Sequence, residues 1–286
     1  MSGTDLRAKL AGDNIIAAPG IYDHMSLLMA NEMSFDAHYA SGYWGTASAM
    51  GEPDVGVAGY SDFLRIFSGF AAKSKAPIIA DADTGFGSLA NLAHAVKGYQ
   101  TAGIAAMQIE DQGFPKICGH VGQAVSVEAE EMIRRMHVAV EARGEGDILI
   151  IARSDARRTE GLDSAITRLN AYADNGADIL FLEAPKNLDE IREAASRVSK
   201  PLLVNAAHGG FTPILAPADY QALGAKLVIY PAGAPLAAAQ AAKNFYANLK
   251  SGDANGDGVG HFDFGDMSRL LGIDDVVALQ KRHGGA

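Results

Sequence analysis

Eight short apolar runs that alternate with helix-like stretches limit the possible folds of this chain more than any other feature. The runs are rich in Ile, Val, Leu and Ala and occupy residues 15–20, 37–42, 77–83, 105–111, 148–155, 177–184, 201–207 and 227–233. Between them, amphipathic patterns such as GLDSAITRLNAYADNG predict helices that end near Gly103 and Gly176. Continuous apolar strands alternating with helices indicate a parallel sheet covered on both faces. Eight such units predict an α/β fold, a (β/α)₈ barrel of the TIM type, with an open doubly wound sheet as the alternative.

The length and the last part of the chain refine this prediction. A chain of 286 residues suits one large barrel, so we expect residues 1–286 to form a single barrel domain. After residue 234 the pattern changes to an Ala-rich helix, a Gly/Asp loop and a final helical segment. We therefore expect residues 235–286 to be a C-terminal helical extension that makes oligomer contacts.

Composition narrows the class of partner. The net charge of -10 disfavours nucleic acid, because neutralising phosphates needs clustered Lys and Arg, but it leaves small anionic substrates, which a few local cations can hold. The single cysteine excludes an internal disulfide framework. The polar N-terminal stretch has no signal-peptide pattern, and no apolar run is long enough to span a membrane. These features predict a cytoplasmic protein.

Polar residues stand at the ends of most of the apolar runs. In a barrel these ends converge at one mouth, where active sites lie. Asp81 and Asp83 alternate, so both face one side of a strand end, and Glu110 ends the next run. Such hard oxygen ligands suit Mg²⁺, whereas one cysteine and scattered histidines do not suit zinc. The sequence therefore predicts a magnesium site, with capping of the following helix as the alternative role of the two aspartates.

Seven motifs in this order resemble one known superfamily. SGY, EPDVG, DADTGFGS, IEDQGFPKICGH, ARSDA, FLEAP and N…GGFTP, spread over about residues 15–245, are similar to the isocitrate lyase/phosphoenolpyruvate mutase superfamily. The CGH loop resembles the branch of carbon–carbon lyases that includes 2-methylisocitrate and dimethylmalate lyases, together with the related oxaloacetate hydrolases. The resemblance implies a (β/α)₈ barrel whose last helix is swapped between subunits of a homotetramer.

The resemblance also implies roles for individual residues. Asp81 and Asp83 would hold Mg²⁺, or Mn²⁺, supported by Asp54 and Glu110. Cys118 would exchange the proton at the carbon released by cleavage, and Tyr39 would contact the nascent carbonyl. Arg153 would also stabilise the developing enolate, and Glu110 is a further catalytic candidate. The residues that would bind the substrate are Ser41, Gly42, Tyr43, Gly119, His120, Arg153, Glu183 and Asn205.

The implied reaction explains why a lone cysteine would be needed. Loss of the hydroxyl proton from a 2-hydroxy acid breaks the C2–C3 bond in a retro-aldol step, and a 2-oxo acid leaves. An acid must then protonate the remaining carbanion, and a thiol of tuned pKa can do so. Lys116 and His120 flank Cys118 and would tune it. The alternative is that Cys118 is a small buried hydrophobic residue.

The expected function is therefore a Mg²⁺-dependent lyase acting on an alkylmalate or methylisocitrate type of 2-hydroxydicarboxylate. Two alternatives stay open: an oxaloacetate hydrolase or decarboxylase of the same superfamily, and a non-catalytic protein that senses a dicarboxylate. The string YPAGAPLAAA lacks the arginine found there in 2-methylisocitrate lyases, which favours a smaller dicarboxylate. The roles of Trp44 and His208 are open between packing or loop positions and contact with substrate.

Overall fold

The computed structural model describes residues 2–114, 116 and 125–284. The chain forms two compact units, residues 1–234 and residues 235–286. The first unit contains all eight strands. They are parallel and close into a barrel in chain order, with β8 paired to β1 through Ile16 and Leu227. The strands are β1 (Ile16–Ile21), β2 (His38–Ala40), β3 (Ile78–Asp81), β4 (Ala106–Glu110), β5 (Leu149–Ser154), β6 (Ile179–Leu182), β7 (Leu202–Asn205) and β8 (Leu227–Tyr230).

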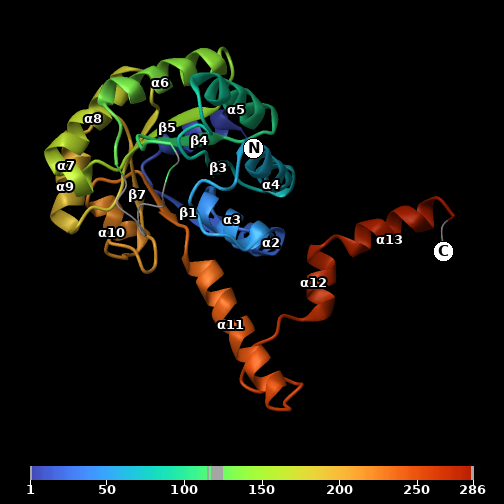
Figure 1. The fold of residues 1–286 in the computed structure, drawn as a ribbon. Coiled ribbons are helices and arrows are strands. Elements are labelled where there is room, and N and C mark those ends of the chain that lie inside the picture. The colour runs from blue at the N-terminus through green and yellow to red at the C-terminus, as the bar shows by residue number, and fades with distance from the viewer. Residues whose placement is uncertain (1, 115, 117–124, 285–286) are drawn as a thin grey trace. The chain divides into compact units, whose positions relative to one another are not determined.

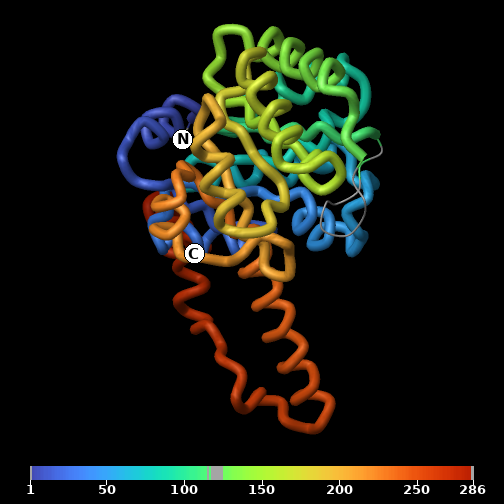
Figure 2. Tube along the Cα trace, turned by 90° about the vertical axis from the view of Figure 1, so that its left-hand side faces the viewer, coloured from blue at the N-terminus to red at the C-terminus, as the bar shows by residue number. Residues whose placement is uncertain are grey.

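The barrel predicted from the sequence is confirmed, and each apolar run holds one strand. The open doubly wound sheet is excluded because the sheet closes. Helices surround the strands (Figure 1), and the tube view from the side shows the green and yellow helices covering one flank of the barrel (Figure 2). The helices of this unit are α1 (Gly3–Leu10), α2 (His24–Glu32), α3 (Gly42–Met50), α4 (Tyr60–Lys73), α5 (Leu89–Thr101), α6 (Ala129–Arg143), α7 (Arg157–Glu160), α8 (Leu162–Asp174), α9 (Leu188–Arg197) and α10 (Pro217–Ala222).

The helix ends follow the glycine signals in the sequence. Helices α5 and α8 end two residues before Gly103 and Gly176, whose φ angles are +82° and +107°. A residue without a Cβ adopts this left-handed conformation at little cost, so glycine stops the helix and turns the chain into the next strand.

Two apolar layers make up the core of the barrel unit. One lies between the strands and the helices, where Phe63, Phe67 and Phe70 of α4 are fully buried at helical spacing. The other fills the inside of the barrel, with contributions such as Ile151 and Phe181. Leu6 of α1 belongs to this inner layer, so α1 closes the amino-terminal end of the barrel. The opposite end is the one where the strands finish in polar residues.

The second unit is helical. It consists of most of α11 (Gly233–Lys250), together with α12 (Phe264–Leu270) and α13 (Ile273–Arg282). The final segment, expected as one helical stretch, is broken by Gly272, whose φ of +86° is left-handed. Several large apolar side chains of this helical unit are exposed, among them Tyr246, Phe264 and Leu271. Within the described part of the chain, no helix has both the length and the apolar character needed to cross a membrane.

Candidate active site

Strand alternation places the predicted polar residues inside the barrel. On β5, Leu149 and Ile151 belong to the inner apolar layer, and the next residue of the same parity is Arg153. The same alternation makes the inner face of the other strands change from apolar to polar at their carboxyl ends. The polar residues in this register are Tyr39, Asp81, Gln108, Glu110, Arg153, Glu183 and Asn205.

Asp81 is held in one orientation by three donors. Its Oδ2 accepts the N–H of Gly42 at 3.2 Å, and its Oδ1 accepts the N–H of Asp83 at 3.0 Å. The third donor is Gln108 Nε2 at 3.3 Å, while Gln108 Oε1 accepts the hydroxyl of Tyr39 at 2.9 Å. A Cβ at Gly42 would lie 2.8 Å from Asp81 Oδ2, so glycine is needed for this close approach.

Neither aspartate caps the following helix, because Ser88 is the N-cap residue of α5. Asp83 lies instead in a turn closed by a hydrogen bond from Gly85 N–H to the carbonyl of Ala82, and its own φ is +49°. Asp83 is 5% exposed. The turn therefore directs a second carboxylate to the end of the barrel, next to Asp81.

Lys116 joins Asp83 to Asp54, which precedes α4. Its Nζ lies 2.8 Å from Asp54 Oδ2 and 2.7 Å from Asp83 Oδ1, and the lysine side chain is 4% exposed. The sequence suggested that Lys116 tunes Cys118. Cys118 lies outside the described residues, so that role stays a prediction; the ammonium group of Lys116 contacts two of the carboxylates predicted to serve the metal.

Arg153 links the ends of β4, β5 and β6 at the barrel mouth. It donates from Nε and Nη2 to the two oxygens of Asp155, at 2.9 and 2.8 Å. Its Nη1 lies 3.4 Å from Glu110 Oε2, and its Nη2 lies 3.6 Å from Glu183 Oε2. The guanidinium also lies over the ring of Phe181. One buried arginine therefore faces three carboxylates, and Asn205 adds a hydrogen bond to Glu183 Oε2 at 3.4 Å.

Among the described residues, carboxylates outnumber cations at this end of the barrel. Five of six buried acids pair with Lys116 or Arg153, and Asp81 accepts uncharged donors; the six are Asp54, Asp81, Asp83, Glu110, Asp155 and Glu183. Burial raises the pKa of Asp83 to about 7 despite the opposing charge of Lys116, and burial also raises the pKa of Asp54, Glu110 and Asp155. Burial disfavours the charged form of Lys116, but its carboxylate neighbours together raise its pKa well above the ordinary value. Among the described residues, the site therefore holds more acids than cations.

The remaining predicted residues fall into two groups. Ser41 is the N-cap of α3, where its hydroxyl accepts the N–H of Trp44, and Tyr43 packs edge-on against the Trp44 ring. The amino-terminal end of α3 therefore faces Asp81 through Gly42. Cys118, Gly119 and His120 lie outside the described residues.

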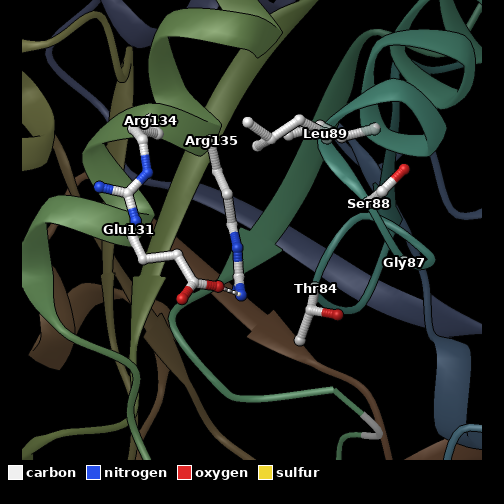
Figure 3. A pocket seen from close by; sticks show the side chains of 8 residues that line it. Thr84, Gly87, Ser88, Leu89, Glu131, Arg134 and Arg135 are labelled. Carbon is white, nitrogen blue, oxygen red and sulfur yellow. Dashed lines mark hydrogen bonds and ion pairs between the residues drawn. The ribbon is translucent and has the colours of Figure 1, made fainter.

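A cavity lies beside the turn that carries Asp83. It has a volume of about 270 Å³ and lies between the turn at Thr84–Ser88 and α6 (Figure 3). The Arg135 side chain extends along it, pairs with Glu131, and donates to the backbone carbonyls of Glu110 and Gln112 at 3.0 and 2.9 Å. Arg135 thus fixes the end of β4 and with it the position of Glu110.

Two residues of the site were missed by the sequence analysis. Gln108 stands inside an apolar run with the parity of Glu110, and this polar residue at an inward position was a usable signal. Asp111 directly follows Glu110 and was given no role in the sequence analysis. It is fully buried and accepts hydrogen bonds from Ser154 Oγ, Tyr172 OH and the N–H of Asp155, so its role is to hold the strand ends together.

Comparison with known proteins agrees with this architecture. The family model for phosphoenolpyruvate phosphomutase matches residues 6–250. The chain is 35% identical to 2,3-dimethylmalate lyase of Eubacterium barkeri over 282 residues, covering 97% of this chain and 96% of that protein. It is 41% identical to 2-methylisocitrate lyase of Aeropyrum pernix over 229 residues, covering 80% of this chain and 73% of that protein.

Solved structures extend the comparison to bound ligands. Oxaloacetate acetylhydrolase in complex with 3,3-difluorooxalacetate aligns with a TM-score of 0.93 at 30% identity, covering 100% of this chain and 98% of that one. Phosphonopyruvate hydrolase in complex with oxalate and Mg²⁺ aligns with a TM-score of 0.88 at 28% identity, covering 99% of each chain. The superfamily resemblance inferred from the sequence motifs is confirmed, and both sequence relatives are named as lyases. The chain belongs to the phosphoenolpyruvate phosphomutase family, within the phosphoenolpyruvate mutase/isocitrate lyase superfamily of barrel enzymes.

Proposed function

We propose that this protein is a Mg²⁺-dependent carbon–carbon lyase. It cleaves a substituted 2-hydroxydicarboxylate, of the alkylmalate or methylisocitrate type, into a 2-oxo acid and a carboxylate. The observation that carries the proposal is the surplus of buried carboxylates around Arg153 and Lys116 at the carboxyl end of the barrel. The similarity over nearly the whole chain to a 2,3-dimethylmalate lyase supports the reaction type.

The residues present fit a divalent cation. Neither carboxylate oxygen of Glu110 accepts a hydrogen bond, although both are buried, and the acids around it exceed the cations. Within residues 2–114, 116 and 125–284, no three ligand side chains converge on one point. Mg²⁺ does not require this, because it keeps several waters and takes one or two carboxylates. Asp81 and Asp83 would hold the ion, with Asp54 and Glu110 in support, and Mn²⁺ is the alternative.

When bound, the ion would supply Lewis-acid stabilisation of negative charge on substrate oxygens. The chain itself would bind the carboxylates. The amino-terminal end of α3, with Ser41 and the amide of Tyr43, favours an anion because helix N–H groups and the helix dipole point outward there. Arg153 would take part in holding the other carboxylate, next to Glu183 and Asn205, and Gly119 and His120 would also contact the substrate.

Proton movements are assigned to three residues. Glu110, once ionised, would accept the hydroxyl proton, since neither of its buried oxygens already accepts a hydrogen bond and a carboxylate of raised pKa is the stronger base. Burial likewise raises the pKa of Tyr39 well above its ordinary value, so its hydroxyl stays protonated near the forming carbonyl. As the C2–C3 bond breaks, its electron pair remains on the released carbon, and the thiol of Cys118 would donate a proton there.

A product assay tests the function. The purified protein with Mg²⁺ would be offered malate, methylmalates, 2,3-dimethylmalate, isocitrate, 2-methylisocitrate and oxaloacetate, with products identified by NMR. The expected result is a 2-oxo acid and a matching carboxylate from one of the substituted malates. Failure of every 2-hydroxydicarboxylate, with turnover of oxaloacetate alone, would reject the lyase.

That second outcome corresponds to the alternative function, an oxaloacetate hydrolase or decarboxylase. The observation in its favour is the TM-score of 0.93 with oxaloacetate acetylhydrolase bound to an oxaloacetate analogue. Oxalate plus acetate would identify the hydrolase, and pyruvate plus CO₂ would identify the decarboxylase.

Replacing Cys118 with serine is expected to reduce lyase turnover by about a hundredfold to ten-thousandfold, because a serine hydroxyl is a much weaker acid than a tuned thiol. Affinity for oxalate in the presence of Mg²⁺ is expected to stay unchanged. Turnover and oxalate titration would be measured on the same preparation. Full turnover in the serine variant would remove Cys118 from the proton transfer and favour the decarboxylase.

Mg²⁺ is expected to stabilise the protein more at about pH 8 than at about pH 5. The pKa of Asp83 rises from 3.8 to about 7 on folding, so the folded state binds more protons than the unfolded state in this window. Stability of the metal-free protein therefore falls as pH rises from about 4 to 7, and the ionised carboxylates then bind Mg²⁺ best. Thermal unfolding with EDTA and with MgCl₂ at both pH values measures the difference, expected to be about 5 °C or more.

Among the described residues, His38 has a pH dependence of the opposite sign. Burial lowers the pKa of His38, so its contribution to stability rises with pH. His38 begins β2 at the amino-terminal end of the barrel, opposite the carboxylates. Its contribution to stability is therefore the same in EDTA and in MgCl₂, and it cancels in the difference between the two. An increment that is equal at both pH values would contradict Mg²⁺ binding at these carboxylates.

The helical unit of residues 235–286 is proposed to pack on a partner subunit in a homotetramer. Its exposed apolar side chains, including Tyr246, Phe264 and Leu271, support this proposal because such surface is usually covered by protein. Light scattering of the full chain distinguishes a tetramer from a monomer. The cytoplasm is the proposed location, since a single cysteine leaves no internal disulfide to form.

A further inference from the structure

Lys116 stands where a cation is needed in the metal-free protein. Its ammonium group contacts Asp83 Oδ1 at 2.7 Å and Asp54 Oδ2 at 2.8 Å, and both carboxylates are almost fully buried. The three side chains come from three separate segments: the end of β3, the connection before α4, and the segment after β4. The lysine side chain itself is 4% exposed. Removing an ammonium ion from water is costly, and only close carboxylates offset that cost.

The same oxygens cannot serve Lys116 and a divalent cation equally well. A metal ion on Asp83 would lie within a few ångströms of a positive ammonium group in a buried setting, where like charges repel strongly. Asp81 differs, because its oxygens accept backbone and amide donors, which carry no net charge. The contact that has to loosen on metal binding is therefore the one between Lys116 and Asp83.

We propose that Lys116 is an internal counter-ion that holds Asp54 and Asp83 in the metal-free protein and gives up Asp83 when the divalent cation binds. It thereby weakens and sets the metal affinity of the site. Lys116 acts as a positioning residue, because it reaches the ion through the carboxylates. This inference rests on the proposed metal site, and it adds that Lys116 competes with the metal ion for Asp83.

A substitution of Lys116 with methionine tests the proposal. Methionine keeps an unbranched side chain of similar length and removes the charge. Without metal, the midpoint of thermal unfolding is expected to fall by about 5 to 10 °C, because two buried carboxylates lose their shared partner. The dissociation constants for Mg²⁺ and Mn²⁺, measured by isothermal titration calorimetry on the full chain, are expected to decrease about tenfold or more. Added MgCl₂ is expected to restore the lost thermal stability.

Lys75→Met is the matched control. Lys75 pairs with Glu32 at 3.1 Å on the surface and precedes β3 at the opposite end of the strand from Asp81, so it changes the net charge equally at a distance. Its metal affinity is expected to equal that of the wild type. If the Lys116→Met protein does not fold without metal, the double variant Lys116→Met with Asp54→Asn removes one charge of each sign and is measured in its place.

The possible outcomes separate the two ideas. Tighter metal binding by Lys116→Met, with no change in Lys75→Met, supports the counter-ion. Equal or weaker binding by Lys116→Met, while the wild type binds Mg²⁺, overturns it and leaves Lys116 as a purely structural ion pair. A wild type that binds neither Mg²⁺ nor Mn²⁺ rejects the metal site of the proposed function, and the counter-ion with it.

Discussion

Replacing Asp83 with asparagine is expected to lower metal-dependent turnover by about a thousandfold or more while leaving the barrel folded. Asparagine has the same size and is one of the residues that tolerate a positive φ, so the backbone at +49° is not strained. The substitution removes one carboxylate of the proposed metal site. Mg²⁺ affinity, measured by calorimetry, is expected to fall at least about tenfold.

The stability of the metal-free Asp83→Asn protein separates a metal ligand from a structural acid. Burial raises the pKa of Asp83 to about 7, and acids outnumber cations among the described residues of the site. Removing this carboxylate is therefore expected to leave stability at about pH 8 unchanged or higher. Lys116 keeps Asp54 as a partner. Thermal unfolding in EDTA measures this effect.

Asp111→Asn is the contrasting variant. Asp111 is also a buried acid at a strand end, but its oxygens accept hydrogen bonds from Ser154 Oγ at 2.7 Å and Tyr172 OH at 2.9 Å. An amide cannot accept all of these bonds, so a loss of about 2 kcal/mol in the free energy of unfolding is expected, with Mg²⁺ affinity unchanged. Wild-type Mg²⁺ affinity and turnover in Asp83→Asn would show that Asp83 is not a metal ligand.

The difference between these two aspartates shows what the sequence can and cannot predict. The inward position of Asp81, Glu110 and Arg153 could be predicted, because side chains alternate along a strand and the apolar run fixes which of its last residues face inward. The structural role of Asp111 could not be predicted, because its hydrogen-bond donors include Ser126, Ser154 and Tyr172, which lie up to 61 residues away in the chain. Periodicity carries no information about such partners.

Lys116 is a second residue whose contacts could not be predicted from the sequence pattern. The eight strands and the glycines after α5 and α8 repeat a pattern, and the structure follows it. Lys116 lies in a segment without periodicity and meets Asp54 from 62 residues away. Its neighbours along the chain could suggest only a role beside Cys118. Its contacts with Asp54 and Asp83 could not be predicted, because they depend on three segments meeting at the barrel mouth.

The second large effect is expected for Arg153→Met. Arg153 is the shared counter-ion of Asp155, Glu110 and Glu183, and breaking such a buried group is expected to cost about 3 to 5 kcal/mol of unfolding free energy. Turnover is expected to fall at least about a thousandfold, because the cation proposed to hold a substrate carboxylate is lost. Chemical unfolding and turnover per folded molecule measure the two effects separately.

The pH dependence of the Arg153→Met protein has a predictable sign. Burial already raises the pKa of Glu110 and Asp155 in the wild type, and loss of the arginine raises it further. Groups with a raised pKa stabilise the folded state when protonated, so the variant is expected to regain stability as pH falls from about 8 to about 5. Turnover is not expected to return at the lower pH. Protonation of the acids removes the unbalanced charge, but it does not restore the guanidinium that would hold the substrate.

Arg143→Met controls for the loss of a half-buried arginine. Arg143 Nη1 pairs with Asp178 Oδ2 at 2.7 Å, and the two arginine side chains are similarly buried, at 17% and 11% exposed. Asp178 precedes β6, at the amino-terminal end of the barrel, where changes affect stability and not chemistry. Arg143→Met is therefore expected to lose stability with unchanged turnover per folded molecule. If Arg153→Met behaved in the same way, Arg153 would be a structural residue of the barrel mouth, and the binding of the substrate carboxylate would have to be reassigned.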